Sequence, residues 1–169
     1  MLSKREQAFF YWYFIIHIPI TVLIDSSVIL PDRFQYTRRL VDWHIVQNND
    51  FLLYEKPLWL KCFVWVEVVA QLPAFFWFAV KIKQLWAMQE HKSKRDKAEV
   101  HKHKATLSRW LKVYGWNASL TTLVCIYAIW IRGYYPSVPF ISMTTRDKLQ
   151  LIGLYVPYLL LPLYLVFFA

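Results

Sequence analysis

Long apolar segments alternate with shorter polar ones along this chain. Four segments contain one formal charge between them, that of Glu67, and they cover residues 8–24, 62–80, 113–131 and 149–169. A helix rises about 1.5 Å per residue, so roughly 20 apolar residues cross the hydrocarbon layer of a bilayer. The pattern predicts an all-α membrane protein. We expect one domain over residues 1–169, a four transmembrane helix bundle with spans at approximately 6–30, 58–83, 108–132 and 145–169.

Prolines interrupt three of these predicted spans. Pro19 lies in the first, Pro73 in the second, and Pro157 and Pro162 in the fourth. Proline removes a backbone hydrogen bond and bends a helix, and a bend opens space between neighbouring helices. Pockets inside bundles form at such places. We therefore expect proline-kinked helices that enclose an intramembrane pocket.

The charge is distributed unevenly and predicts the topology. The net charge is +9, and residues 81–112 carry ten Lys and Arg against three acids, while the N-terminal segment adds Lys4 and Arg5. Four spans place the termini and the second connection on one side, so the positive-inside rule predicts that both termini are cytoplasmic. The basic run is also typical of segments that bind anionic headgroups or nucleic acid. The predicted topology alone explains the basic run, so we expect no nucleic acid partner.

The connections between the predicted spans differ in character. Residues 84–107 contain no Gly or Pro, so we expect the second and third spans to continue as helices beyond the membrane. Leu40, Trp43 and His44 follow helical spacing within residues 31–56, which predicts a short interfacial helix and a loop folded over the bundle mouth. Residues 133–142 are predicted to be a plain luminal turn.

Asp25 is the first candidate for chemistry, near the luminal end of span one. Thr21 precedes it by one turn, and Pro19 precedes both. A carboxylate that faces a pocket opened by the proline would bind a cationic amine or a hydroxyl. The alternative is an acid that caps the helix end or is hydrated at the interface. Ionisable residues in a span point to an internal site by default.

Glu67 and Gln71 lie one turn apart in span two. Glu67 is about nine residues into the span, which corresponds to roughly 14 Å of helix and places it near the bilayer centre. The two side chains share a face, which favours a functional pocket that binds a ligand or transfers protons. The alternative is a structural hydrogen bond between helices, with an average contribution of about 0.6 kcal/mol.

Further polar groups accompany these acids. Asp50 precedes span two, where it would share a proton with Asp25 or orient it, although a solvated loop acid is the simpler interpretation. Tyr114, Asn117 and Thr121 form one polar stripe on span three at i, i+3 and i+7. Span four contributes hydroxyl groups next to its prolines, from Tyr155 and Tyr158.

Motifs of soluble enzymes are missing from the sequence. No nucleophile–base pair, phosphate-binding glycine loop or metal-ligand cluster is visible, and the chain has 3 glycines. We expect no cofactor and no metal.

Three stretches carry a family resemblance. They are HIPITVLIDSSVILP (17–31), NDFLLYEKPLWLKCFVWVEVVAQLP (49–73) and LYVPYLLLP (154–162). Together they resemble the sigma-2 receptor branch of the EXPERA family, in a fungal member. The basic connection and span three match the branch less well.

The resemblance implies a function and a site. Members of the family are four-helix proteins of the endoplasmic reticulum, often dimeric. They include the emopamil-binding protein, a sterol Δ8-Δ7 isomerase, and the sigma-2 receptor, which binds sterols and cationic amphiphilic amines. By this resemblance Asp25 pairs with a ligand ammonium and Asp50 is its hydrogen-bonded second acid. The other implied pocket residues are Glu67, Gln71, Thr121 and Tyr155.

The resulting expectation is a non-enzymatic, multi-pass receptor-like protein of the endoplasmic reticulum membrane. It would bind a sterol or a cationic amphiphilic amine, act in sterol homeostasis or trafficking, and form a homodimer. Two acids and a pocket also meet the minimum for a sterol isomerase, which is the first alternative. The second is an interaction or quality-control adaptor for other membrane proteins.

Overall fold

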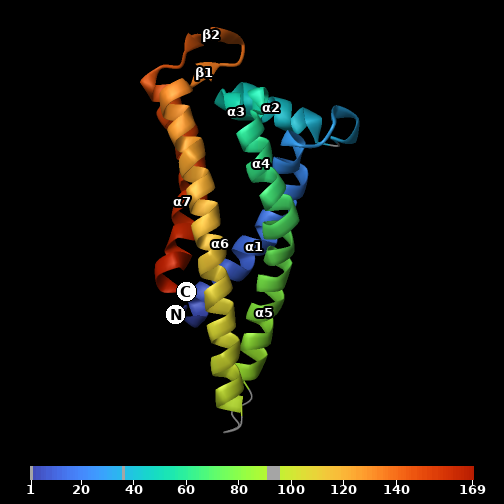
Figure 1. Cartoon of the computed structure of the whole chain (residues 1–169), viewed down its shortest axis with the longest axis vertical. Helices are drawn as coiled ribbons and strands as arrows, with labels where there is room; N and C mark the ends of the chain where they lie inside the picture. Colours follow the sequence, from blue (N-terminus) through green and yellow to red (C-terminus); the bar gives the residue numbers. More distant parts are fainter. Residues whose placement is uncertain (1, 36, 91–95) are drawn as a thin grey trace.

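The computed structural model describes residues 2–35, 37–90 and 96–169 and consists mainly of long helices that run side by side (Figure 1). The principal helices are α1 (Lys4–Leu23), α5 (Leu72–Glu90), α6 (Asp96–Arg132) and α7 (Thr145–Phe168). α1 packs mainly on α5, and α6 packs on α7 and, less extensively, on α5. The two chain ends lie close together (Figure 1). They are joined by a hydrogen bond from the Tyr164 hydroxyl to Glu6.

Shorter elements close the opposite end of the bundle. They are η1 (Asp25–Val28), η2 (Asp32–Phe34), α2 (Arg38–Asn48), α3 (Phe51–Glu55), β1 (Tyr134–Tyr135) and β2 (Val138–Ser142). Lys56 Nζ donates to the Ser27 carbonyl at 2.8 Å, and Arg132 pairs with Glu55 at 3.0 Å. The predicted helix before span two is present as α2. The plain turn predicted at residues 133–142 is wrong, because β1 and β2 pair there as an antiparallel hairpin.

Three helical segments of the described chain are long and apolar enough to cross a membrane. They are Lys4–Val28, Leu58–Gln89 and Thr145–Phe168, close to the predicted first, second and fourth spans. The third predicted span lies within α6, which is not among these segments, so the count of four spans stays a prediction. α5 and α6 do continue as helices toward residues 91–95, where the predicted basic connection lies partly outside the described residues.

The second span changes its winding at the point where its polar residues occur. α4 (Leu58–Val66) passes through a π-helical turn, η3 (Glu67–Gln71), into α5. Leu72 N–H bonds to the Glu67 carbonyl, five residues back. Pro73 follows at once and has no N–H to donate, so the regular hydrogen-bond ladder cannot continue there. Turns of this kind occur frequently at functional sites.

Local sequence signals explain where α1 and α7 begin. Ser3 and Glu6 form a reciprocal capping box, in which Ser3 N–H donates to Glu6 Oε2 at 2.5 Å and Glu6 N–H donates to Ser3 Oγ at 3.3 Å. Thr144 Oγ1 accepts from Asp147 N–H at 3.2 Å at the start of α7. Each cap satisfies a backbone donor that a helix start leaves without a partner.

The interior contains two separate apolar clusters. The first lies toward the chain ends and includes Phe10, Phe14, Phe75 and Phe78, all at most 2% exposed. The second lies toward the hairpin and includes Val28, Phe51, Leu60, Cys125, Ile129 and Leu151. Polar side chains of α1, η3 and α6 lie between the two clusters. The bundle is therefore filled by apolar side chains toward both ends and contains polar side chains in its middle.

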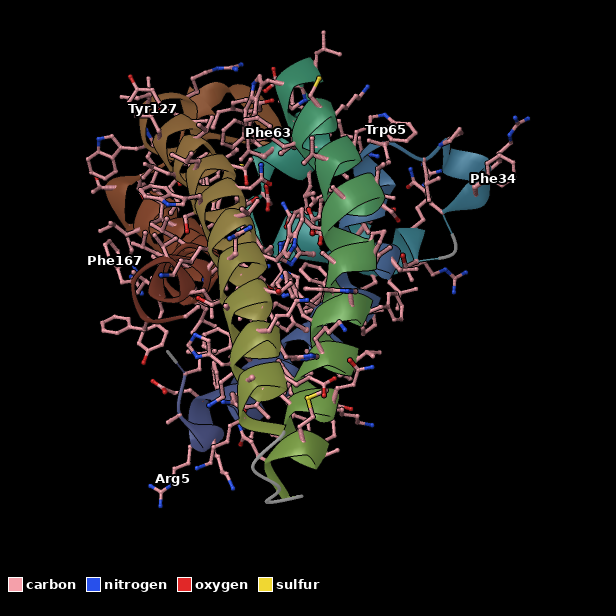
Figure 2. The ribbon with its side chains drawn as sticks, turned by 60° about the horizontal axis from the view of Figure 1, so that its bottom comes forward. Arg5, Phe34, Phe63, Trp65, Tyr127 and Phe167 are labelled. Atoms are coloured by element: carbon pink, nitrogen blue, oxygen red, sulfur yellow. The ribbon has the colours of Figure 1, made fainter. Side chains whose placement is uncertain are left out.

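The outward surface of the bundle is apolar. Large side chains exposed there include Trp12 and Ile16 on α1, Trp116 and Leu120 on α6, and Leu160 and Phe167 on α7. In Figure 2, Phe63 lies between α4 and α6, whereas Trp65, Tyr127 and Phe167 lie at the periphery. An apolar exterior around a partly polar interior suits a helix bundle surrounded by lipid.

A glycine allows the close approach of α6 and α7, and this gives a prediction about stability. A Cβ at Gly115 would lie 2.5 Å from the Pro162 carbonyl oxygen and 3.0 Å from Val166 Cγ2. We expect Gly115→Ala to lower stability by about 1–3 kcal/mol, because the obstructing atom is backbone. Thermal unfolding in detergent measures the effect.

Gly153 provides the matched control for this substitution. It also lies in a helix, but a Cβ there would meet no atom within 4 Å. Gly153→Ala should leave Tm unchanged or raise it slightly, since alanine is favoured over glycine in helices by about 1 kcal/mol. Equal behaviour of the two variants would contradict the assigned contact between α6 and α7.

Candidate functional site: a polar cavity between the helices

A cavity of about 210 Å³ lies between the two apolar clusters. Its wall comes from α1, η1, α2, α3, α4, η3, α6 and α7, so segments far apart in the sequence contribute. The six residues predicted from sequence all line this one cavity, and they are Asp25, Asp50, Glu67, Gln71, Thr121 and Tyr155. The structure thus brings them together, while their role in binding a ligand stays a prediction.

The first polar group of the cavity is an acid pair. Thr21 Oγ1 donates to Glu67 Oε1 at 2.8 Å, which links α1 to the π-helical turn. The Asp25 carboxyl lies close enough to that of Glu67 for the two groups to interact. Two carboxylates at such a position repel each other, which favours one proton shared between them. The pair can therefore present one negative charge to the cavity, while its proton lies between the two carboxyl groups.

Asp50 has a structural position that sequence reasoning did not favour. Its side chain is 1% exposed, so the interpretation as a solvated loop acid is wrong. Oδ1 caps α3 by accepting from Leu52 N–H at 3.1 Å and Leu53 N–H at 3.2 Å. Oδ2 accepts from the Tyr155 hydroxyl at 2.9 Å and lies 3.5 Å from His44 Nε2. Three hydrogen-bond donors and the nearby His44 ring replace the water that a loop would have supplied.

The predicted polar stripe of α6 also lies toward the interior. Gln71 Nε2 donates to Asn117 Oδ1 at 2.7 Å, which joins the π-helical turn to α6. Thr121 lines the cavity, with its hydroxyl bonded to the backbone carbonyls of Asn117 and Ala118 at 3.1 Å. The neighbouring Thr122 lines it as well.

Other cavity residues were not predicted as site residues. Tyr13 and Tyr114 line it, and their hydroxyl oxygens are 2.9 Å apart. The His17 ring lies against those of Tyr13 and Tyr158, with centroids at 4.8 and 5.3 Å. The sequence signal for these residues was the presence of polar rings within apolar spans. How deep each ring lies in the bundle, and which way it faces, depends on how the helices pack.

The donor set defines what the cavity can do. Carboxyl, hydroxyl and amide groups on apolar walls are suited to hold a cationic amine or a hydroxyl. Within residues 2–35, 37–90 and 96–169, no group of three or more His, Cys, Asp or Glu could hold a metal ion.

Comparison with known proteins identifies the family. Residues 36–169 match the EXPERA (EXPanded EBP superfamily) family. The chain is 46% identical over 169 residues to Efficient mitochondria targeting-associated protein 19 of Saccharomyces cerevisiae, covering 98% of each. It is 32% identical over 175 residues to Sigma intracellular receptor 2 of Xenopus tropicalis, covering 97% of this chain and 87% of that one. With the Homo sapiens receptor it shares 29% over 172 residues, covering 92% and 82%.

The chain therefore belongs to the EXPERA family, and the resemblance found in its sequence motifs is confirmed. It is a membrane protein related to the two kinds of protein just named. Neither relative's name describes an enzyme.

The position of Asp50 gives a prediction about stability. Asp50→Ala removes the cap of α3 and leaves the Tyr155 hydroxyl without an acceptor. We expect a loss of about 2 kcal/mol, from roughly equal contributions of the cap and the buried hydrogen bond. Asp50→Asn should lose less, because one side-chain oxygen remains. Thermal unfolding of both variants in detergent provides the measurement.

Asp42 on α2 is the control for Asp50→Ala. Its side chain is 63% exposed and lies 3.7 Å from Arg38. Exposed pairs of this kind contribute less than about 1 kcal/mol, so Asp42→Ala should change Tm very little. Similar losses from the Asp42 and Asp50 substitutions would contradict the buried role of Asp50.

Proposed function

We propose that this protein is a non-enzymatic, receptor-like protein of the endoplasmic reticulum membrane. Its cavity would bind a sterol or a cationic lipophilic amine, in the service of sterol homeostasis or trafficking. The observation that carries the proposal is the acid pair of Asp25 and Glu67, which faces a partly open cavity between apolar helices. The kinship to Sigma intracellular receptor 2 supports the same class of function.

Each predicted site residue has a role in this proposal. Asp25 would accept the ammonium or hydroxyl of the ligand, and Glu67 would share a proton with it. Asp50 would hold the closing helices through Tyr155 and keep a second acid near the ligand. Gln71 and Thr121 would form the polar wall beyond the acids. Partial exclusion of water from a site between helices strengthens a charge pair of this kind.

The proposal includes a topology of four spans with bends at the prolines. α6 would be the fourth crossing, since it packs along α7 for much of its length and exposes Trp116 and Leu120 outward. Both termini and the basic ends of α5 and α6 would be cytoplasmic, and a homodimer would be the assembled form. The chain ends lie together, and α2 and the hairpin lie at the other end (Figure 1), which supports this arrangement.

Two other functions are tied to particular observations. The acid pair beside Thr21 contains a proton donor, which an isomerase of the same family would need. The ends of α5 and α6 extend beyond α1 and α7 (Figure 1), and the cations there, among them Lys97 and Lys102, would suit an adaptor for other proteins. The receptor-like function is preferred because it uses all six of the cavity residues that were predicted from the sequence.

Binding of a lipophilic amine tests the proposal directly. N,N-Dimethyldecylamine should bind the purified protein in nanodiscs saturably, as measured by calorimetry. Asp25→Asn removes the charge and keeps the shape, so it should weaken binding by at least about thirtyfold, as expected when one partner of a buried charge pair is lost. Glu67→Gln should also weaken it, by a smaller factor.

Asp42→Asn is the control for a general charge effect, because Asp42 is exposed on α2 outside the cavity. The Asp42→Asn protein should bind the amine with the same affinity as the unmodified protein. Failure of the amine to bind, or equal binding by the Asp25→Asn protein, would exclude the proposed receptor function.

A Δ8 sterol distinguishes the receptor from the isomerase. The purified protein, incubated with the Δ8 sterol in nanodiscs, should give no Δ7 product by mass spectrometry with chromatographic separation. Product that forms with the unmodified protein and disappears in Glu67→Gln would establish the enzyme instead.

A further inference from the structure

α2 is apolar on two opposite sides. Val41 and Ile45 are 3% and 9% exposed and belong to the apolar cluster toward the hairpin. Leu40, Trp43 and Val46 lie on the other side, where they are 44%, 60% and 78% exposed. Successive helical residues are about 100° apart, so these three positions share one side of α2, centred opposite Val41 and Ile45. We call this side the outer face of α2, and the rest of the described chain leaves it exposed.

The outer face of α2 begins beside a helix that can cross the membrane. Thr37 immediately precedes α2, and its hydroxyl donates to the Leu23 carbonyl at the end of α1. Val22 and Leu23 are 47% and 43% exposed, and α1 lies within the apolar segment Lys4–Val28. Phe34 of η2 is 49% exposed and lies at the periphery of the bundle (Figure 2). Exposed apolar side chains therefore extend from the end of a candidate membrane span to α2.

Exposed cations accompany these apolar side chains. Arg33 lies over the Phe34 ring, with 4.9 Å between its Cζ and the ring centroid. Arg39 is exposed, and its position around α2 falls between those of Trp43 and Val46. An arginine side chain can lie along an apolar surface while its guanidinium group stays in a polar layer, where it binds phosphate oxygens. Trp is also typical of membrane interfaces. The combination therefore matches the headgroup layer of a phospholipid bilayer.

We propose that the outer face of α2, together with Phe34, Arg33 and Arg39, binds the phospholipid leaflet at the hairpin end of the bundle. Its apolar side chains enter the boundary between headgroups and acyl chains, as in amphipathic helices that lie flat on a membrane. The two arginines bind lipid phosphates. This surface is on the outside of the bundle, so the proposal does not depend on which ligand the cavity binds.

Lipid on the outer face also fixes the cover of the cavity. α2 has 11 residues, and an isolated helix of that length is marginal in water. His44 of α2 lines the cavity, and Asp50, which follows α2 by two residues, accepts the hydrogen bonds that cap α3. α2 therefore lies between the leaflet and the cavity, and its contact with lipid holds this segment in place.

Spin labels on α2 test the lipid contact. The full chain with Cys62→Ser and Cys125→Ala receives one labelled cysteine, by Leu40→Cys or Trp43→Cys, and is placed in phosphatidylcholine nanodiscs. Electron paramagnetic resonance then measures the access of oxygen, which concentrates among acyl chains, and of a nickel chelate, which stays in water. Oxygen access should exceed nickel access at both positions. Asp42→Cys is the matched control on the flank of the same helix, and there the order should be reversed, because Asp42 is exposed next to Arg38.

Removal of the cations tests the contact with phosphate. Arg33→Gln combined with Arg39→Gln should lower the ratio of oxygen to nickel access at a label on Leu40→Cys, because α2 then lies less deeply in the leaflet. Lys97→Gln combined with Lys102→Gln removes two cations from the opposite end of the bundle and should leave the ratio unchanged. Equal ratios in the two double variants would refute the role of the arginines. Unchanged Tm values show that both variants remain folded.

Other results at the outer face would overturn the proposal. If nickel reaches the labels at Leu40 and Trp43 as readily as the label at Asp42, the outer face lies in water. If neither reagent reaches them and the labels of two molecules couple, a second copy of the chain covers the face. If neither reagent reaches them and no coupling appears, another segment of the same chain covers it. Each of these results refutes the lipid contact and leaves the amine-binding test of the proposed function unaffected.

Discussion

Carboxyl groups that lie between apolar helices need partners, and the arrangement of this bundle follows from that requirement. An unpartnered acid away from water is costly, whereas a hydrogen-bonded one is tolerated. Each acid here is satisfied by a different part of the chain: Glu67 by Thr21 of α1, and Asp50 by Tyr155 of α7 and by the backbone of α3. These bonds connect helices that are far apart in sequence. The same bonds that make the acids tolerable therefore hold the wall of the cavity.

The cavity exists because the middle of the bundle is packed differently from its ends. Above and below, aromatic and aliphatic side chains fill the space between helices. Between them the second span passes through a π-helical turn before Pro73, and polar side chains replace the apolar ones. Such a turn changes the direction in which Glu67 and Gln71 face. Polar contacts at this level join the helices without filling the space between them, so a cavity remains.

The closing elements add a further constraint. α2 and α3 are short and would not be stable alone, since isolated helices of this length are marginal in water. Asp50 initiates α3, and the Lys56 and Arg132 contacts hold the segment against η1 and α6. Membership of the EXPERA family and this arrangement are the two findings on which the proposed receptor-like function rests.

Much of the architecture was determined locally by the sequence. Apolar runs of sufficient length gave the spans near Lys4–Val28, Leu58–Gln89 and Thr145–Phe168, because a helix must satisfy its backbone within itself in lipid. Asp25, Glu67 and Gln71 stood out because polar groups are rare at that depth. The motifs around them also identified the family, through residues adjacent in sequence.

Tertiary structure decided which of these polar groups meet, and it corrected the local interpretation. The burial of Asp50 depends on Tyr155, which is more than a hundred residues away, and no periodicity reports such a contact. The pairing of Tyr13 with Tyr114 and the hairpin of β1 and β2 likewise depend on how distant segments approach. Sequence patterns report the face and depth of a residue on its own helix. The partner across the bundle is set by packing, which involves the whole chain at once.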